Sequence, residues 1–187
     1  MYNCFYTWPV YKATIFGSKL KLFFKQFDMP FPEFKKFIGS RLKFTLFLFL
    51  KLPAAWVCGV RLLETDGTHA VVTVPYKWLS QNPFSSIYFA CQAMAAEMST
   101  GILAMGHSFQ LTPKVSMLVT NVNGQFLKKA NSKVFFTCKD GKEILQTIQE
   151  AVATGEAKTF VAKSSGVNQL GEIISEFEIE WSFKVKG

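Results

Sequence analysis

The feature that most limits how this chain can fold is an apolar stretch, residues 84–106, that contains a single carboxylate. Nearly every residue in it is Ala, Met, Ile, Leu, Phe, Gly, Ser or Thr, and its one carboxylate is Glu97. A helix that is hydrophobic on all sides belongs in a protein core, where a carboxylate is costly unless it is paired or used in chemistry. The sequence therefore predicts a long buried helix, Ser86 to Met105, and makes Glu97 the first candidate for a catalytic residue.

The residues around this stretch favour an antiparallel sheet. In residues 172–185 apolar and charged side chains alternate, which is typical of a strand with one buried and one solvated face. Two β-branched runs on either side of an Asp-Gly turn signal predict a hairpin, Val57–Glu64 with His69–Pro75. Further elements are expected as strands at 114–122, 132–138 and 158–163, with turn-prone Asn123-Gly124 after the first, and as a helix at 140–155. The predicted fold class is α+β, with a curved antiparallel sheet wrapped around one long helix.

The N-terminal quarter differs from the rest in charge. Residues 1–50 contain eight Lys and Arg side chains against two carboxylates, in two amphipathic helical patterns, 13–27 and 33–51. We therefore expect a basic, Phe-rich helical extension, residues 1–52, and a domain, residues 53–187. The extension suits packing of its phenylalanines against the sheet or a partner, and it equally suits an interfacial helix that contacts anionic lipid through residues 13–50. Nucleic-acid binding is not expected, because no recognised motif accompanies the charge.

Composition excludes several classes of protein. Hydrophobic residues make up 49% of the chain and charged residues 18%, which excludes wholesale disorder. Four scattered cysteines and two histidines predict neither a disulfide framework nor a metal site, and no cofactor is expected. The first nine residues lack the features of a secretory signal, and the longest strongly apolar run, Phe44–Leu50, is far shorter than the about 20 residues of a transmembrane helix. We expect a cytoplasmic protein, with the periphery of the inner membrane as the alternative.

The residues that precede Glu97 resemble those of a known family. The chain resembles the hotdog-fold thioesterases in the order of its predicted elements and in the string Asn82-Pro83-Phe84-Ser85-Ser86-Ile87-Tyr88-Phe89-Ala90, followed by Glu97. It is most similar to the branch related to phenylacetate-degradation thioesterases, and within that branch to a domain family of unknown function, over about residues 53–181. Such enzymes have a His-Gly-Gly turn at the start of a long buried helix and an Asp or Glu seven residues after the second glycine. Glu97 fills that carboxylate position.

The resemblance implies the hotdog fold and hydrolysis of an acyl-thioester carried by coenzyme A or acyl carrier protein. It implies that Glu97 acts as general base or nucleophile, that the Phe89 and Ala90 amides bind the developing oxyanion, and that Asn82 orients the carbonyl or a water molecule. It also implies a homodimer with an active site shared between subunits. Small neighbours of Glu97 on the helix, such as Gly101, leave room for a ligand beside the carboxylate.

One departure from the family pattern makes catalysis a hypothesis to be weighed against simple binding. Tyr88-Phe89-Ala90 replaces His-Gly-Gly, which keeps the backbone donors but puts a bulky ring where the relatives need close approach. The alternative function is a non-catalytic hotdog module that binds acyl chains or acyl-thioesters, and a third is a peripheral membrane protein that only dimerises.

Each candidate residue also has a structural interpretation. Glu97 could pair with a lysine across a dimer or cap a neighbouring loop, Asn82 could simply hold a turn, and Tyr88 could be a buried aromatic at a helix start. His107 is expected as a cation that stabilises the end of the helix, whereas His69 has no evident partner. The remaining basic cluster, expected as a solvated face or as contacts for the phosphates of coenzyme A, is Lys128, Lys129 and Lys133.

Overall fold

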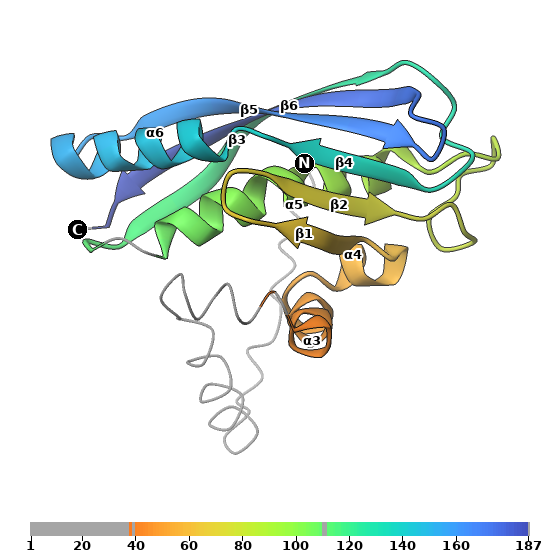
Figure 1. Cartoon of the computed structure of the whole chain (residues 1–187), viewed down its shortest axis with the longest axis horizontal. Helices are drawn as coiled ribbons and strands as arrows, with labels where there is room; N and C mark the ends of the chain where they lie inside the picture. The colour runs from red at the N-terminus through yellow and green to blue at the C-terminus, as the bar shows by residue number, and fades with distance from the viewer. Residues whose placement is uncertain (1–37, 39, 110–111, 187) are drawn as a thin grey trace, which may run out of the picture.

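A six-stranded antiparallel sheet and one long helix against its inner face make up most of the molecule (Figure 1). The structure is a computed structural model and describes residues 38, 40–109 and 112–186. The strands follow the order β1-β2-β4-β5-β6-β3 across the sheet. Their bounds are β1 Arg61–Thr65, β2 Ala70–Val74, β3 Val115–Phe126, β4 Val134–Cys138, β5 Lys158–Asn168 and β6 Ile173–Val185. The helices are α3 Arg41–Lys51, α4 Pro53–Cys58, α5 Phe89–Ser108 and α6 Gly141–Thr154.

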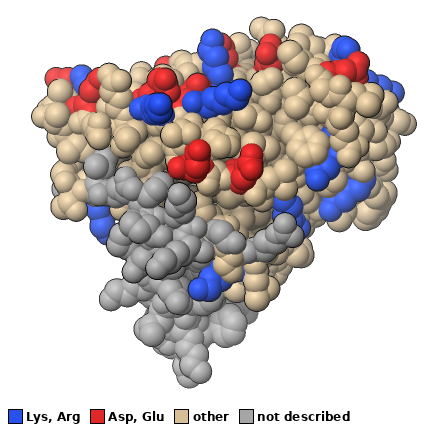
Figure 2. Space-filling model, in the orientation of Figure 1, with Lys and Arg blue, Asp and Glu red and all other residues tan. Residues whose placement is uncertain are grey.

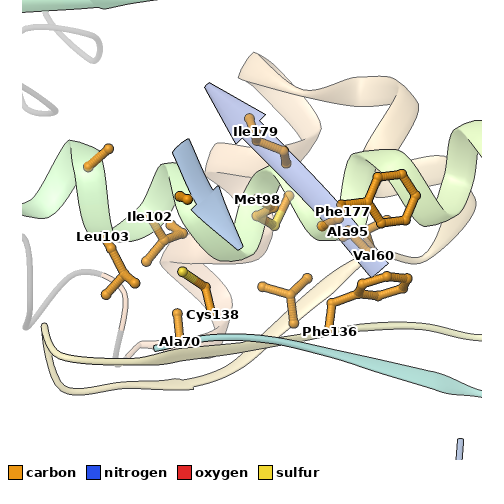
Figure 3. Close-up of a cluster of buried hydrophobic side chains, with 14 of the residues drawn as sticks. Val60, Ala70, Ala95, Met98, Ile102, Leu103, Phe136, Cys138, Phe177 and Ile179 are labelled. Atoms are coloured by element: carbon orange, nitrogen blue, oxygen red, sulfur yellow. The ribbon is translucent and has the colours of Figure 1, made fainter. Parts of the chain in front are cut away.

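Helix α5 is the buried helix that the apolar stretch predicts. It contacts β2, β4, β5 and α6, and its side chains Met98 and Leu103 belong to the same buried hydrophobic cluster as Phe136 and Ile179 of the sheet (Figure 3). The helix begins three residues later than predicted, because the preceding residues make other hydrogen bonds. The Ile87 N–H donates to the Ala130 carbonyl at 2.7 Å, which ties the approach to α5 to the segment between β3 and β4.

The two strongest local patterns of the sequence are confirmed. In β6, Phe177, Ile179, Trp181 and Phe183 are buried, as the alternation predicts. Helix α6 buries its apolar face and ends at Gly155, whose φ of 71° is the left-handed conformation that favours glycine at a helix end. Together with the antiparallel sheet and α5, these elements confirm the predicted α+β class.

Two sequence predictions are wrong in detail. Residues 57–58 end the short helix α4 instead of starting a strand, because Pro53 opens that helix and Gly59, with φ of 80°, closes it. Asn123 and Gly124 form no turn, since both lie inside β3 and pair with β6. Gly124 is needed there for space: a Cβ would lie 2.7 Å from the ring of Phe177.

The two described histidines correct further expectations. His107 lies near the end of α5 but is buried, and its Nε2 lies 2.8 Å from the carbonyl oxygen of Gly67. Burial lowers the pKa of His107 below its ordinary 6.5, so the side chain is neutral at pH 7 and is not the cation expected at a helix end. His69 does have partners, because its Nδ1 is 3.0 Å from Asp66 and its Nε2 is 3.5 Å from Glu64.

The N-terminal side of the domain is described only from residue 38 onward. The predicted helix 13–27 lies outside the described residues, and of the predicted helix 33–51 the structure describes α3. Within the described residues, no helix is long and apolar enough to cross a membrane. Helix α4 contacts the start of α5 through two thiols, Cys58 and Cys91, whose sulfur atoms are 3.3 Å apart. The division at residue 52 stays a prediction.

Candidate active site

The turn that leads into α5 is organised by the side chain of Asn82. Its Oδ1 accepts hydrogen bonds from the backbone N–H of Phe84 at 3.0 Å, from the N–H of Ser86 at 3.2 Å and from the Ser86 hydroxyl at 3.1 Å. The Asn82 N–H in turn donates to the Ser86 carbonyl at 2.8 Å. The side-chain oxygen is therefore committed to the turn, and among the described residues no acceptor takes the hydrogens of the side-chain NH₂ group.

The first turn of α5 presents backbone donors without acceptors. Tyr88 precedes the helix in an extended conformation, and its carbonyl accepts hydrogen bonds from the N–H groups of Cys91 and Gln92. The N–H groups of Phe89 and Ala90, the first two residues of α5, donate to no acceptor in the described part of the chain. Because such groups point along the helix axis at its positive end, they are suited to bind a developing negative charge.

The Phe89 ring contributes to an aromatic row that runs from α5 to the sheet. Its centroid is 4.7 Å from that of Tyr88 and 6.4 Å from that of Phe126 on β3. The row continues to Phe177 of β6 and then to Phe136 of β4. Its first three rings are exposed and its last two are buried, so the row leads from solvent into the core beside the start of α5.

Glu97 lies two turns further along α5 and is half-buried, and its carboxyl makes no hydrogen bond or ion pair with any residue that the structure describes. Burial raises the pKa of its carboxyl above the ordinary 4.5, because desolvation disfavours the charged form. Within the described residues of one chain the Glu97 carboxyl caps no loop, and its pairing with a lysine across a dimer stays a prediction. An unpaired carboxyl with a raised pKa is the property expected of a catalytic base.

The Glu97 carboxyl lies close to Gly101, next to the ring of Trp181. A Cβ on Gly101 would be 3.2 Å from Glu97 Oε1 and 3.3 Å from two carbons of the Trp181 ring, so the carboxyl and the indole both approach this glycine. The indole is fixed, since Trp181 Nε1 donates to the Thr100 hydroxyl oxygen at 2.9 Å. That hydroxyl donates to the Glu97 carbonyl at 3.0 Å, which connects the three residues to one turn of α5.

The carboxyl and the amides of one chain are far apart. Seven residues separate Ala90 from Glu97, which corresponds to about 10 Å along the helix axis. Glu97 Oε1 lies over Gly101, one turn further from the amides, so its distance from them exceeds that rise. A substrate carbonyl group that accepts a hydrogen bond from the N–H of Phe89 or Ala90 therefore lies too far from the Glu97 carboxyl of the same chain to be hydrolysed with its help.

A continuous flank of α5 and β3 holds these groups at the surface. On α5 the half-buried Ala93, Met94 and Glu97 follow the exposed Phe89 at helical spacing. On β3, Val122 and Phe126 pair with inward-facing residues of β6 and so point to the side of the helix, yet both are exposed. β3 is also an edge strand, with β6 as its one neighbour in the sheet.

Other sites are less suited to chemistry. No group of His, Cys, Asp and Glu in the described ranges could hold a metal ion. A hollow of about 200 Å³ lies on the outer face of the sheet, lined by residues of β3, β5 and β6 such as Lys163 and Glu176, and it includes none of the candidate residues. In the basic cluster, Lys128 is 2.8 Å from Glu172 and Lys133 lies over the Phe135 ring, so two of the three lysines have partners of their own.

Comparison with known proteins gives a family and a fold. The family described as "Domain of unknown function (DUF4442)" matches residues 40–182. No curated protein matches the sequence.

Three solved structures illustrate the likeness in fold. A protein of unknown function from Pseudomonas aeruginosa, named a probable thioesterase, is 16% identical with a TM-score of 0.66, over 85% of this chain and 99% of that one. A protein of unknown function from Chlorobaculum tepidum has the same TM-score at 14% identity, over 78% and 94% of the two chains. A thioesterase from Haemophilus influenzae is 12% identical with a TM-score of 0.57, over 78% and 91%.

Proposed function

We propose that this chain, which belongs to the DUF4442 family and has the hotdog fold, hydrolyses acyl-thioesters with Glu97 as the general base. The observation that carries the proposal is the unpaired, half-buried Glu97 carboxyl, held on Gly101 and Trp181 with a raised pKa. The thioesterases among the proteins of similar fold support the same class of reaction.

The proposed reaction has two steps, attack by water and collapse of the intermediate, and each includes one proton transfer. Glu97 takes a proton from a water molecule as the water oxygen attacks the thioester carbonyl carbon. The N–H groups of Phe89 and Ala90 bind the oxyanion of the tetrahedral intermediate, helped by the positive end of α5. When the intermediate collapses, the C–S bond breaks and the leaving thiolate receives the proton held by Glu97. A carboxylic acid and a free thiol result.

The distance between carboxyl and amides favours a site made by two copies of the chain. Because Glu97 lies more than about 10 Å from the amides of its own α5, we infer a homodimer in which Glu97 of one copy faces Phe89 and Ala90 of the other. The exposed flank of α5 and β3 supports this arrangement, since it carries both groups together with apolar side chains and the free edge of the sheet.

The chemistry of the flank favours an apolar acyl group on coenzyme A or acyl carrier protein. The exposed rings of Phe89 and Phe126 lead to the buried ring of Phe177, which gives an acyl chain an apolar path beside the amides. In this arrangement Phe89, which replaces a glycine of the relatives, contacts the acyl group while its own N–H still binds the oxyanion.

The test measures thiol release, with a colorimetric thiol reagent, from coenzyme A thioesters carrying short, medium, long and aromatic acyl groups. Glu97→Gln keeps the shape of the side chain but cannot accept the proton, so we expect kcat to fall by about 10²- to 10⁴-fold. Glu143→Gln, on the exposed surface of α6, is the matched control and leaves kcat unchanged.

Two outcomes decide against hydrolysis at Glu97. Turnover by Glu97→Gln and Glu97→Ala at the rate of the native chain would reject the mechanism. Saturable binding of the thioesters by the native chain without any thiol release would instead select the non-catalytic acyl-binding module, for which the loss of His-Gly-Gly is the supporting observation.

A further inference from the structure

Three connections of the fold meet at one end of the molecule, where α5 begins. They join β2 to α5 (residues 75–88), β3 to β4 (residues 127–133) and β5 to β6 (residues 169–172), and all lie at the right-hand end in Figure 1. Backbone hydrogen bonds tie them together. The Ile87 N–H donates to the Ala130 carbonyl at 2.7 Å, and the Leu127 N–H donates at 2.8 Å to the carbonyl of Ile174 in β6, just after the third connection. We name these three connections the loop end.

The loop end exposes large apolar side chains on each of its three connections. The most exposed are Leu170 at 85%, Trp78 at 79% and Phe84 at 76%, and Leu127 and Leu79 are about half exposed. Phe84 is presented by the rigid turn that Asn82 organises. Because these side chains come from separate turns, they form a set of protruding tips and not the wall of one groove.

The loop end is also basic. It carries Lys77, Lys128, Lys129 and Lys133, while its one carboxylate, Glu172, pairs with Lys128 at 2.8 Å. Lys77 and Lys129 are exposed. Figure 2 shows acidic side chains gathered towards the upper part of the molecule and basic side chains continuing down its right-hand side.

The opposite end of the sheet provides an internal comparison. The connections there that the structure describes in full are the β1–β2 turn (residues 66–69), the β4–α6 link (residues 139–140) and the α6–β5 link (residues 155–157). These three segments contain no exposed large apolar side chain, and each contains an acidic residue. Among these fully described connections of the sheet, apolar tips with net positive charge therefore occur at the loop end and not at the opposite end.

We propose that the loop end docks onto a lipid bilayer with anionic headgroups. Protruding Trp, Phe and Leu side chains enter the interfacial region of a bilayer, where Trp is particularly favoured, and lysines beside them pair with anionic headgroups. This surface is made of residues outside the range 13–50, and the proposal does not depend on hydrolysis at Glu97. Docking would place the start of α5 next to the membrane.

The test is flotation of the full chain with vesicles of phosphatidylcholine alone or with 30% phosphatidylglycerol added. We expect the native chain to float with the anionic vesicles. In Trp78→Ser/Phe84→Ser/Leu170→Ser the floating fraction falls at least fivefold, because the tips no longer insert. The control Leu63→Ser/Val161→Ser removes exposed apolar side chains of β1 and β5 and floats as the native chain does.

A charge variant separates lipid attraction from general stickiness. Lys77→Glu/Lys129→Glu lowers binding to the anionic vesicles about tenfold or more, and Lys139→Glu/Lys142→Glu, exposed at the opposite end, has little effect. Flotation of the loop-end variants equal to that of the native chain would overturn the proposal and assign any membrane binding to another segment. Absence of flotation by the native chain would overturn it as well, and would point to a protein partner for the same tips.

Discussion

At the scale of one residue, Gly101 is a glycine in the middle of a helix, a position that helices disfavour, and the geometry of the candidate site explains why it is there. In the interior of α5 a glycine costs about 1 kcal/mol relative to alanine, because its backbone is more flexible in the unfolded chain. In exchange, the missing methyl group lets Glu97 Oε1 and the Trp181 ring approach the helix at the same point. Thr100 holds the ring in place from the neighbouring position. These four residues therefore act as one unit, and the carboxyl is the part of it without a partner among the described residues.

The role of the Phe89 amide is testable by a proline. Phe89 is the first residue of α5, a position that tolerates proline, and Tyr88 before it has ψ of 137°, which suits a residue that precedes proline. Phe89→Pro thus removes the N–H and the ring with little cost to the helix, whereas Phe89→Ala removes the ring alone. We expect kcat for thioester hydrolysis to be about 10²- to 10³-fold lower in Phe89→Pro than in Phe89→Ala.

Circular dichroism and thermal melts of both variants show whether α5 is intact. Equal kcat values in two folded variants would contradict an oxyanion role for this amide.

At the scale of elements, His107 connects three parts of the fold that are distant in sequence. It lies near the end of α5, its Nε2 contacts the Gly67 carbonyl in the β1–β2 turn, and its ring also interacts with the backbone of Gly141 at the start of α6. The Gly141 N–H donates to the Thr68 carbonyl at 3.0 Å, and a Cβ on Gly141 would collide with the backbone of that turn. A neutral, buried imidazole therefore holds the hairpin, α5 and α6 together.

Stability should fall in mild acid because of this histidine. The pKa of His107 is lowered in the folded chain, so the unfolded chain binds the proton more readily. His107 therefore makes its full contribution to the free energy of unfolding above about pH 6.5. That contribution decreases as the pH falls from there towards the lower pKa of the folded chain. Urea unfolding at pH 5 to 8 measures this contribution as the difference in the free energy of unfolding between the native chain and His107→Gln.

That difference shrinks towards low pH, and at pH 8 the loss of the buried hydrogen bonds makes His107→Gln about 1–3 kcal/mol less stable. A difference between native chain and His107→Gln that grows on acidification would reject the linkage.

The elements that could be predicted from the sequence are those specified by local patterns. Helix α6 has an apolar face followed by Gly155, and β6 alternates over its whole length, so neighbouring residues alone determine both. The lengths of β3 and β5 could not be predicted, because Asn123, Gly124, Ser164 and Ser165 are extended only through pairing with β6. In a pair of long antiparallel strands, hydrogen bonds from the neighbouring strand keep residues with a low strand preference extended.

The candidate site could be predicted in part for the same reason. Glu97 stands out in the sequence as the one carboxylate of an apolar helix, and the structure places it in a half-buried position without a described partner. Trp181 could not be recognised as its neighbour, since 81 residues separate it from Thr100 and only the folded sheet brings the two together. The commitment of Asn82 Oδ1 to a turn is likewise visible only in three dimensions.

At the scale of the whole molecule, the described chain leaves one flank of its core helix uncovered. The sheet covers α5 from β2, β4 and β5, but β3 contacts it weakly and leaves Val122 and Phe126 exposed on the helix side. The same flank carries Glu97 and the start of α5. A second copy across this flank would bury the apolar side chains and extend the sheet at its free edge, in agreement with the separation of carboxyl and amides.

A mixing experiment tests whether the site is shared. Glu97→Gln and Phe89→Pro are each expected to be inactive alone. In a homodimer with a shared site, a mixed dimer contains one site with a native Glu97 and a native Phe89 amide. Co-expression in equal amounts should therefore restore about a quarter of the native activity, because half of the dimers are mixed and half of their sites are intact.

Light scattering on the native chain provides the control, with an expected mass of two chains. No recovery of activity in a mixture whose mixed dimers are verified by two affinity tags would place both groups of the site in one copy.

The position of β3 at the sheet edge has a consequence for the chain while it is being made. β3 pairs with β6, and the partners Thr120 and Glu180 are 60 residues apart. At 5–20 residues per second, the ribosome needs roughly 3 to 12 s to travel that distance. When this interval begins, β2 and α5 have been synthesised, whereas β4, β5 and β6 are still to be translated. The strand order of the finished sheet thus sets how long the core helix waits during synthesis for the strands that cover it.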